Sequence, residues 1–214
     1  MKLYTVQVAP NPTKVELYIE EKRALGASIE VDRVIVKLMQ GEQNEPPHRA
    51  RSPFATLPVL EISGRGYLTE SLPIIEYLEE LTSGNKNAMS MWGSDPFERA
   101  KNRDLERIAD TRVLSPVGRY IHATKSPLGL PPNVNIADAA AEQIPQGLSF
   151  FDDLLSDGRA FLAGDTPTVA DCTLAAALQF ARFGAYEVDS GLSALLRWDQ
   201  KFRARRSSQK VLLV

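Results

Sequence analysis

The sequence contains very little cysteine and histidine. Cys172 is its only cysteine, and His48 and His122 are its only histidines. One cysteine excludes an internal disulfide framework and a Cys-x-x-Cys redox pair, and this set is too small for a zinc site of the usual kind. We therefore expect no bound metal, and we expect Cys172 to be a packed, inert thiol.

An excess of charge of one sign and long apolar runs are also absent. Lys and Arg number 25 against 27 Asp and Glu, which gives a formal net charge of -2. This balance gives no electrostatic reason to expect nucleic acid or an anionic membrane as a partner. No apolar run approaches the roughly 18 residues that a membrane span needs. The first residues also lack a basic-then-apolar signal pattern, so we predict a cytoplasmic protein.

The first part of the chain alternates strand and helix signals. "KLYTV" (2–6) and "IEVDRVIV" (29–36) are typical of strands, and they flank an amphipathic helix that begins in "PNPTKV". Asn11 is the expected N-cap of this helix, with Pro12 at its first helical position. Two parallel strands with a helix between them form a βαβ unit with a right-handed crossover.

A polar stretch that we interpret as a loop follows, and then a hairpin and a second helix. The hairpin strands are predicted at 57–62 and 66–68, joined through "SGRG". The helix is predicted in "ESLPIIEYLEEL", with Ser71 at its N-cap. The order βαβ then ββα predicts an α/β domain over residues 1–81 with a four-stranded mixed sheet.

The second part, residues 96–214, shows only helical signals beyond a Ser, Gly and Asn-rich linker. One long helix is expected at 97–124, disturbed at Pro116. Another is expected at 134–156, which Pro145 should kink or divide. The clearest helix is "TPTVADCTLAAALQFARF", whose first residues form a capping box. We therefore predict an all-α domain here.

Several stretches, in this order, resemble the cytosolic glutathione transferase family: "TLPVLE" (56–61), "LTESLPIIEYLEE" (68–80) and "FLAGDTPTVADCTL" (161–174). "APNPTKV" and "GEQ" (41–43) resemble its bacterial, nu-like or related branch. The resemblance implies a thioredoxin-like domain followed by an all-α domain, with glutathione as co-substrate. It also implies a homodimer with a role in detoxification.

The resemblance places the peptide part of glutathione at the turn before the third strand. Pro58, if cis as in the family, leaves the N–H and C=O of Leu57 free to pair with the cysteinyl residue of the ligand like an added strand. Gln43 matches a glutamine that contacts the glycyl end, with a solvated side chain as the alternative. His48 and Thr56 are polar neighbours with weaker support.

The amino-acid end of glutathione carries a carboxylate and an ammonium group. Ser71, at a helix N-terminus, suits the carboxylate because free N–H groups and the helix dipole attract an anion there. The charge of Glu70 suits the ammonium. The alternative is that Ser71 only caps its helix and Glu70 is a solvated acid.

The thiol needs a hydrogen-bond donor, because its reference pKa near about 8.5 leaves little thiolate at neutral pH. The resemblance places the usual hydroxyl at Ala9, which has no side-chain donor. The amide of Asn11 is then the candidate catalytic group, although it could serve only as a helix cap. Thr13 and Tyr4 are weaker alternatives.

The second substrate is expected in the cleft between the domains. Candidate lining residues, each with core packing or a solvated helix face as the alternative, are Arg103, Arg107, Arg112, Tyr120 and Phe183. The leading hypothesis is an enzyme that delivers the glutathione sulfur to an electrophile, a disulfide or a peroxide. A non-catalytic glutathione-binding or protein-interaction module is the alternative, which Ala9 favours. An isomerase or an ether-cleaving enzyme is not separated from these by sequence.

Overall fold

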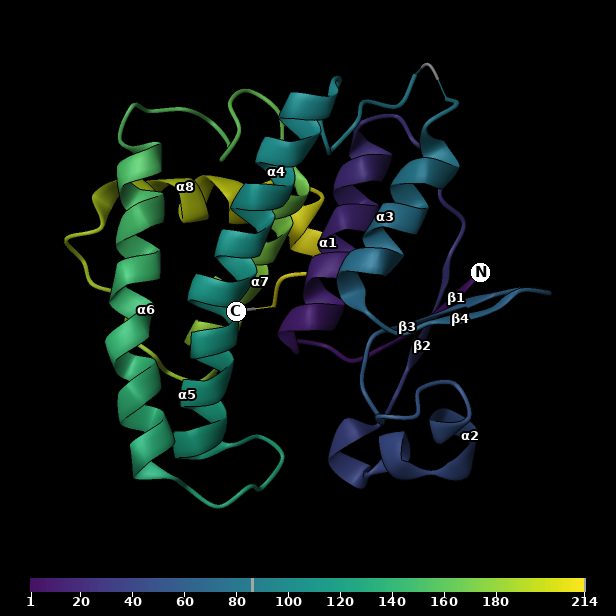
Figure 1. The fold of residues 1–214 in the computed structure, drawn as a ribbon, viewed down its shortest axis with the longest axis horizontal. Coiled ribbons are helices and arrows are strands. Elements are labelled where there is room, and N and C mark those ends of the chain that lie inside the picture. The colour runs from purple at the N-terminus through teal and green to yellow at the C-terminus, as the bar shows by residue number, and fades with distance from the viewer. Residues whose placement is uncertain (86, 214) are drawn as a thin grey trace.

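The N-terminal half of the molecule is built on a four-stranded sheet in the order β2-β1-β3-β4 (Figure 1). The computed structural model describes residues 1–85 and 87–213. Strand β1 (Lys2–Thr5) pairs in parallel with β2 (Asp32–Ile35) and antiparallel with β3 (Val59–Ile62). Strand β4 (Gly66–Leu68) pairs antiparallel with β3. The predicted order of elements and the mixed sheet are confirmed.

Helices α1 (Pro10–Ala24) and α3 (Ser71–Thr82) lie side by side on one side of this sheet (Figure 1). The stretch between β2 and β3, which the sequence predicts to be a loop, instead contains three short helical turns. They are η1 (Leu38–Gln40), η2 (Glu42–Asn44) and α2 (Pro46–Arg49). The sequence does not reveal these turns, because each is too short to show the helical period of apolar residues and they consist largely of proline and polar residues.

Helix α1 is not amphipathic, contrary to the sequence-based expectation. Every residue from Pro12 to Lys22 is buried, because α1 lies between α3 and the helical half of the molecule (Figure 1). Its charged side chains are therefore neutralised by partners on other elements. Lys22 Nζ lies 2.8 Å from Glu79 Oε2 of α3, and Glu21 Oε2 lies 2.6 Å from Arg205 Nη2 near the C-terminal end.

The C-terminal half is helical, as predicted. Its elements are α4 (Pro96–Ile108), the π-helical turn η3 (Ala109–Leu114), α5 (Ser115–Lys125), α6 (Val134–Leu155), α7 (Val169–Phe183), α8 (Ser193–Arg203) and η4 (Ser208–Lys210). No helix in the described part of the chain is both long and apolar enough to cross a membrane.

Two prolines in this half have different effects on their helices. The disturbance expected at Pro116 is present as η3, which ends just before α5. A π turn suits this place because Pro116 cannot donate an N–H to the preceding turn. In contrast, α6 continues through Pro145, so of the two expected effects, a kink or a division, the division is wrong. Tertiary packing of α6 against α5 and η3 holds it together.

One hydrophobic core runs through both halves. It joins the inner faces of α1 and α3 to α4, α6 and α7, so the two halves share buried surface. The predicted capping box at the start of α7 is present: the side chain of Thr168 and that of Asp171 each bond the other's backbone. Cys172 follows inside this helix and is buried, and burial raises the pKa of its thiol well above the usual value. The prediction of a packed thiol is confirmed.

Candidate active site

A cleft of about 400 Å³ lies between the two halves of the molecule. The N-terminal half contributes the loop before α1, the first turn of α1 and the residue before Pro58. The helical half contributes the end of η3, α5 and α7. The lining residues are Ala9, Pro10, Asn11, Pro12, Leu57, Leu114, Ser115, Gly118, Arg119, His122 and Phe180.

A second cavity of about 380 Å³ adjoins this cleft and shares Ala9, Pro10, His122 and Phe180 with it. Its other lining residues are Val6, Gln7, Val8, Ile35, Leu38, Met39, Pro127, Leu128 and Phe183. We call this second cavity the apolar cavity. Among the described residues that line it, Gln7 and His122 have the only polar side chains, so most of its surface suits an uncharged ligand.

The turn before β3 has the form that the sequence predicts. The Leu57–Pro58 peptide bond is cis. The ladder between β1 and β3 begins with the pair Tyr4 and Val59, so Leu57 lies outside it, next to the cleft. Its backbone is therefore placed where an extended ligand could add to the sheet.

His48 and Thr56 hold this turn in place instead of lining the cleft. The buried His48 donates from Nε2 to the carbonyl oxygen of Thr56 at 3.1 Å. Ser52 Oγ accepts the N–H of Thr56 at 3.1 Å. The two bonds fix the chain directly before Leu57, so the effect of His48 on any ligand acts through the turn.

The start of α3 differs from the prediction by one residue. Glu70 is the N-cap and Ser71 is the first helical residue, so the assignment of Ser71 as the cap is wrong. The reason is that the Ser71 hydroxyl donates to Asn11 Oδ1 and does not accept a helix N–H. The first intrahelical bond runs from Ile74 N–H to Glu70 O at 3.0 Å, and Pro73 has no N–H. The N–H groups of Ser71 and its neighbour Leu72 are thus available to an anion.

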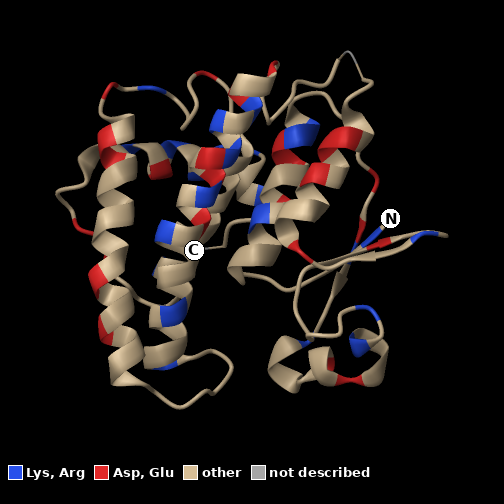
Figure 2. Ribbon diagram, in the orientation of Figure 1, with Lys and Arg blue, Asp and Glu red and all other residues tan. Residues whose placement is uncertain are grey.

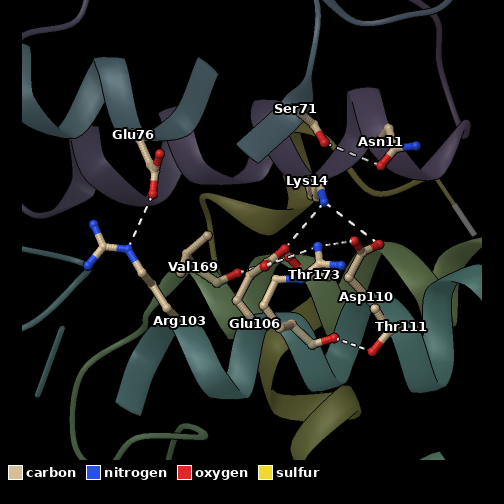
Figure 3. A network of polar contacts seen from close by, with 11 residues as sticks. Asn11, Lys14, Ser71, Glu76, Arg103, Glu106, Asp110, Thr111, Val169 and Thr173 are labelled. Carbon is tan, nitrogen blue, oxygen red and sulfur yellow. Dashed lines mark hydrogen bonds and ion pairs between the residues drawn. The ribbon is translucent and has the colours of Figure 1, made fainter. Parts of the chain in front are cut away.

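Asn11 does not cap α1, because the helix begins one residue earlier, at Pro10, with Ala9 at the N-cap. Proline suits the first helical position, where its missing N–H costs nothing. Asn11 instead points toward α3, where its Oδ1 accepts a hydrogen bond of 3.3 Å from Ser71 Oγ (Figure 3). This bond occupies the amide oxygen and leaves the NH₂ group for a ligand in the cleft.

Thr13 and Tyr4, the alternatives to Asn11, do not line the cleft. Thr13 is buried, and its Oγ1 accepts a hydrogen bond of 3.2 Å from Gln179 Nε2 of α7. The Tyr4 hydroxyl donates to Glu61 Oε2 at 2.7 Å. Burial, together with this bond to the Glu61 carboxylate, raises the pKa of Tyr4 and so disfavours its ionised form.

Gln43 lies on η2, outside the residues that line the cleft and the apolar cavity. Its amide oxygen is buried and has no hydrogen-bond partner among the described residues. Buried amide oxygens normally have a partner, so this atom can accept a donor from a ligand or a water molecule.

A buried ionic network lies one helical turn beyond Asn11 (Figure 3). Lys14 Nζ is 3.3 Å from Glu106 Oε1 and 3.9 Å from Asp110 Oδ1. Thr173 of α7 also donates to Glu106 Oε1, at 3.2 Å. The network ties α1 to α4 and α7 and so fixes the two sides of the cleft relative to each other.

His122 is the functional candidate that sequence reasoning missed. It lies on α5 and lines both the cleft and the apolar cavity. Its Nδ1 is 2.9 Å from Ser126 Oγ, its ring packs against Phe180, and burial lowers its pKa. The available signal was its place on the helix expected to face the cleft. Ser115 and Arg119 on the same helix were missed as well.

The expected second-substrate residues have mixed outcomes. Phe183 lines the apolar cavity, as the hypothesis required. Tyr120 lies outside both spaces, and its ring packs against another aromatic ring at 5.2 Å. Arg103 and Arg107 make ion pairs with carboxylates at 3.2 and 2.6 Å, outside the cleft, and Arg112 lines a separate cavity beside α6.

A thioredoxin-like sheet with a cis proline beside a helix N-terminus, joined to an all-helical half, defines the glutathione transferase class of fold. The model of the glutathione S-transferase N-terminal domain matches residues 3–86, and that of the C-terminal domain matches residues 134–200. The chain belongs to the glutathione transferase family. Members of this family use glutathione as co-substrate.

Three comparisons indicate the range of relatives. Glutathione S-transferase 2 of Saccharomyces cerevisiae is 28% identical over 99% of this chain and 89% of the relative. Maleylacetoacetate isomerase of Rhizobium meliloti is 32% identical over 76% of this chain and 74% of the relative. The crystal structure of a glutathione S-transferase domain-containing protein from Marinobacter aquaeolei VT8 has a TM-score of 0.86 and 32% identity, covering 97% of this chain and 100% of that chain. The relatives thus include both transferases and isomerases, which supports enzyme status and a glutathione-dependent transferase or isomerase activity.

Proposed function

We propose that this chain is a glutathione transferase that joins the glutathione sulfur to an uncharged, apolar electrophile. The observation that carries the proposal is the meeting of the cleft and the apolar cavity at Ala9 and Pro10, the start of α1. A thiolate held at that helix N-terminus would face a substrate in the apolar cavity. The active form proposed is a cytoplasmic homodimer, as is typical of the family.

Glutathione would lie along the cleft with its cysteinyl residue against Leu57. Its glutamyl carboxylate would accept from the free N–H groups at Ser71 and the next residue of α3. The exposed carboxylate of Glu70 would meet the ammonium group. Gln43 is proposed for the glycyl end, where its amide oxygen, which lacks a partner among the described residues, would accept the glycyl N–H of glutathione.

Activation of the thiol would use two groups. The NH₂ of Asn11 would donate to the thiolate, because the amide oxygen is already held by Ser71. His122 would accept the thiol proton on Nε2, since its Nδ1 is engaged with Ser126 and burial lowers its pKa, which keeps it neutral at pH 7. The sulfur then forms the new bond to the electrophile, and the leaving group departs with its electron pair.

The lining of the apolar cavity favours a neutral substrate over an anionic one. In the part of the chain that the structure describes, no Lys or Arg lines this cavity, whereas Arg119 lines the cleft. A maleylacetoacetate isomerase, which the Rhizobium relative is named as, acts on a carboxylic acid. An uncompensated carboxylate in this cavity would lose its hydration without an ion-pair partner. The apolar cavity would accept uncharged peroxides and disulfides for the same reason, because they too are neutral electrophiles.

A non-catalytic glutathione-binding module is the second candidate function. Ala9 favours it, because this N-cap residue has no side-chain hydroxyl to donate to a thiolate. In that case glutathione would bind through Leu57 and Ser71 while its thiol kept an ordinary pKa. The two proposals therefore differ in the ionisation of bound glutathione and not in its binding.

The deciding experiment follows the ultraviolet thiolate absorbance of bound glutathione across pH. In the wild type we expect a thiolate pKa clearly below that of free glutathione, with Asn11→Ala moving it back toward the free value. Turnover of a neutral aromatic halide should exceed turnover of a dicarboxylic alkene. Bound glutathione with an unshifted thiol would favour the binding module, and preference for the dicarboxylate would favour an isomerase.

A further inference from the structure

We infer that Gln179 is a positioning residue that fastens the first turn of α1 to the C-terminal segment of the chain. Gln179 lies on α7 and is fully buried. Its Nε2 donates to Thr13 Oγ1 at 3.2 Å, and its Oε1 accepts the backbone N–H of Leu213 at 2.7 Å. One amide thus joins three segments that are distant in sequence. Its catalytic consequence rests on the proposed function.

The first turn of α1 needs such support, because its own hydrogen bonds are few. Pro10 and Pro12 have no N–H, and Ala9 offers no capping side chain. The turn is closed by the bond from Thr13 N–H to Ala9 O, at 3.0 Å. Outside the helix, the turn is held by Ser71 on Asn11 and by Gln179 on Thr13.

The C-terminal segment is a firm anchor for the other end of the amide. Lys210 Nζ lies 2.8 Å from Glu20 Oε2, so the segment is fixed to α1 independently of Gln179. The Leu213 N–H then sets the amide orientation: oxygen toward the segment and nitrogen toward Thr13. Without this orientation, the amide could not donate to the hydroxyl.

Gln179 also controls the opposite wall of the cleft through its neighbour in sequence. Phe180 lines both the cleft and the apolar cavity. The bond to Thr13 therefore sets the distance between α1, where the thiolate is proposed to form, and the wall that faces the electrophile. A displacement of about 1 Å in such geometry can reduce a rate by about a hundredfold.

The test compares Gln179→Met, Thr13→Val and the double variant, with Thr82→Val as the control. Thr82 is a buried threonine at the far end of α3, whose hydroxyl bonds only its own helix. The first readout is amide hydrogen exchange at Thr13 and at Ile74, which is the first bonded amide of α3. We expect exchange at Thr13 to accelerate about tenfold or more in the three variants, with Ile74 unchanged and no effect in the control.

The second readout is the thiolate pKa of bound glutathione together with kcat and KM. We expect each variant to raise this pKa and to lower kcat about tenfold, with little change in KM for glutathione and no further loss in the double variant. Unchanged Thr13 exchange, or wild-type kcat in Gln179→Met, overturns the inference. An unshifted thiol in the wild type would defeat the proposed function, while the exchange data would still decide the anchoring role.

Discussion

Ionisation of individual side chains determines what chemistry the cleft can support. Cys172, the chain's own thiol, is sealed in α7 with a raised pKa, so any reactive sulfur must come from a ligand. Tyr4 and Thr13 are engaged in bonds outside the cleft. Asn11 and His122, which line the cleft, are the side chains that we propose to act on a ligand thiol.

The pH dependence of turnover should report His122. Burial lowers its pKa below the ordinary value of 6.5, so the neutral, proton-accepting form persists to lower pH than for a free histidine. We expect kcat/KM to fall at acidic pH with one step whose midpoint lies below pH 6.5, and His122→Asn to remove that step and reduce kcat about a hundredfold or more. A pH–rate profile of both proteins measures this. An unchanged profile in the variant would exclude His122 as the base.

Ser71 offers a prediction that separates glutathione binding from chemistry. Its hydroxyl orients Asn11 but does not cap α3, so Ser71→Ala should leave the helix intact. We expect kcat to fall up to about tenfold with little change in KM for glutathione, because the lost bond orients the Asn11 amide and a neutral hydrogen bond contributes about 0.5–1.5 kcal/mol, while the backbone N–H proposed for the glutamyl carboxylate remains. Steady-state kinetics would show this. Ser83→Ala, at the exposed end of the same helix, is the control and should match the wild type.

At the scale of elements, the sequence predicted the order and type of the helices and strands better than the residues at which they begin and end. The strands, the hairpin and the capped α7 follow from local signals, such as the reciprocal bonds of Thr168 and Asp171. The start of α1 does not, because Asn11 is a good cap in isolation and only the nearby Ser71 redirects its amide. Likewise, Pro145 breaks isolated helices, yet packing keeps α6 whole.

The same limit applies to the candidate site. The cis bond between Leu57 and Pro58, and with it the place of Leu57 beside the cleft, was predictable because a short motif carries it. His122 was not, because its relevance depends on α5 facing the cleft, a tertiary fact. The buried faces of α1 were equally hidden, since a helix enclosed on all sides with paired charges has no amphipathic pattern.

Asp171, in the capping box that begins α7, is expected to make the stability of the protein depend on pH. Burial is the main cause that raises the pKa of Asp171, to about 6, against opposing hydrogen bonds from Leu162 and Thr168. Because the folded pKa lies above the unfolded value of 3.8, folding takes up a proton between these values. The contribution of this carboxyl is therefore fully present below pH 3.8 and is lost as pH rises through about 6.

Asp171→Asn tests this linkage, because its side chain does not titrate. The free energy of unfolding of the wild type, relative to the variant, should fall by about 2 kcal/mol between pH 4 and pH 7. Urea denaturation at several pH values measures the difference. A constant difference across that range would show that Asp171 keeps an ordinary pKa despite its burial.

For the whole molecule, the arrangement of charge explains how the two halves hold together. Figure 2 shows acidic and basic residues concentrated on α1, α3 and α4, where the halves meet. The loop after α5, residues 126–133, contains no charged residue, and part of it lines the apolar cavity. Polar contacts thus secure the interface between the halves, and the substrate side of the cleft stays apolar.

The Lys14–Glu106 pair allows this interface to be tested. Both side chains are almost fully buried, at 2% and 0% exposed, so removing one partner leaves an uncompensated charge in the core. Lys14→Met should lower the free energy of unfolding by about 3–5 kcal/mol. The double variant Lys14→Met with Glu106→Leu should recover most of this loss, because both desolvation costs disappear together.

The exposed pair of Arg103 and Glu76 serves as the matched control, since it also joins α4 to the N-terminal half. Its side chains are 49% and 38% exposed, so Arg103→Met should cost about 1 kcal/mol or less. Chemical denaturation of all the variants gives the comparison. If the double variant loses as much stability as the two single losses added together, Lys14 and Glu106 act independently, and the shared hydrophobic core alone holds the halves together.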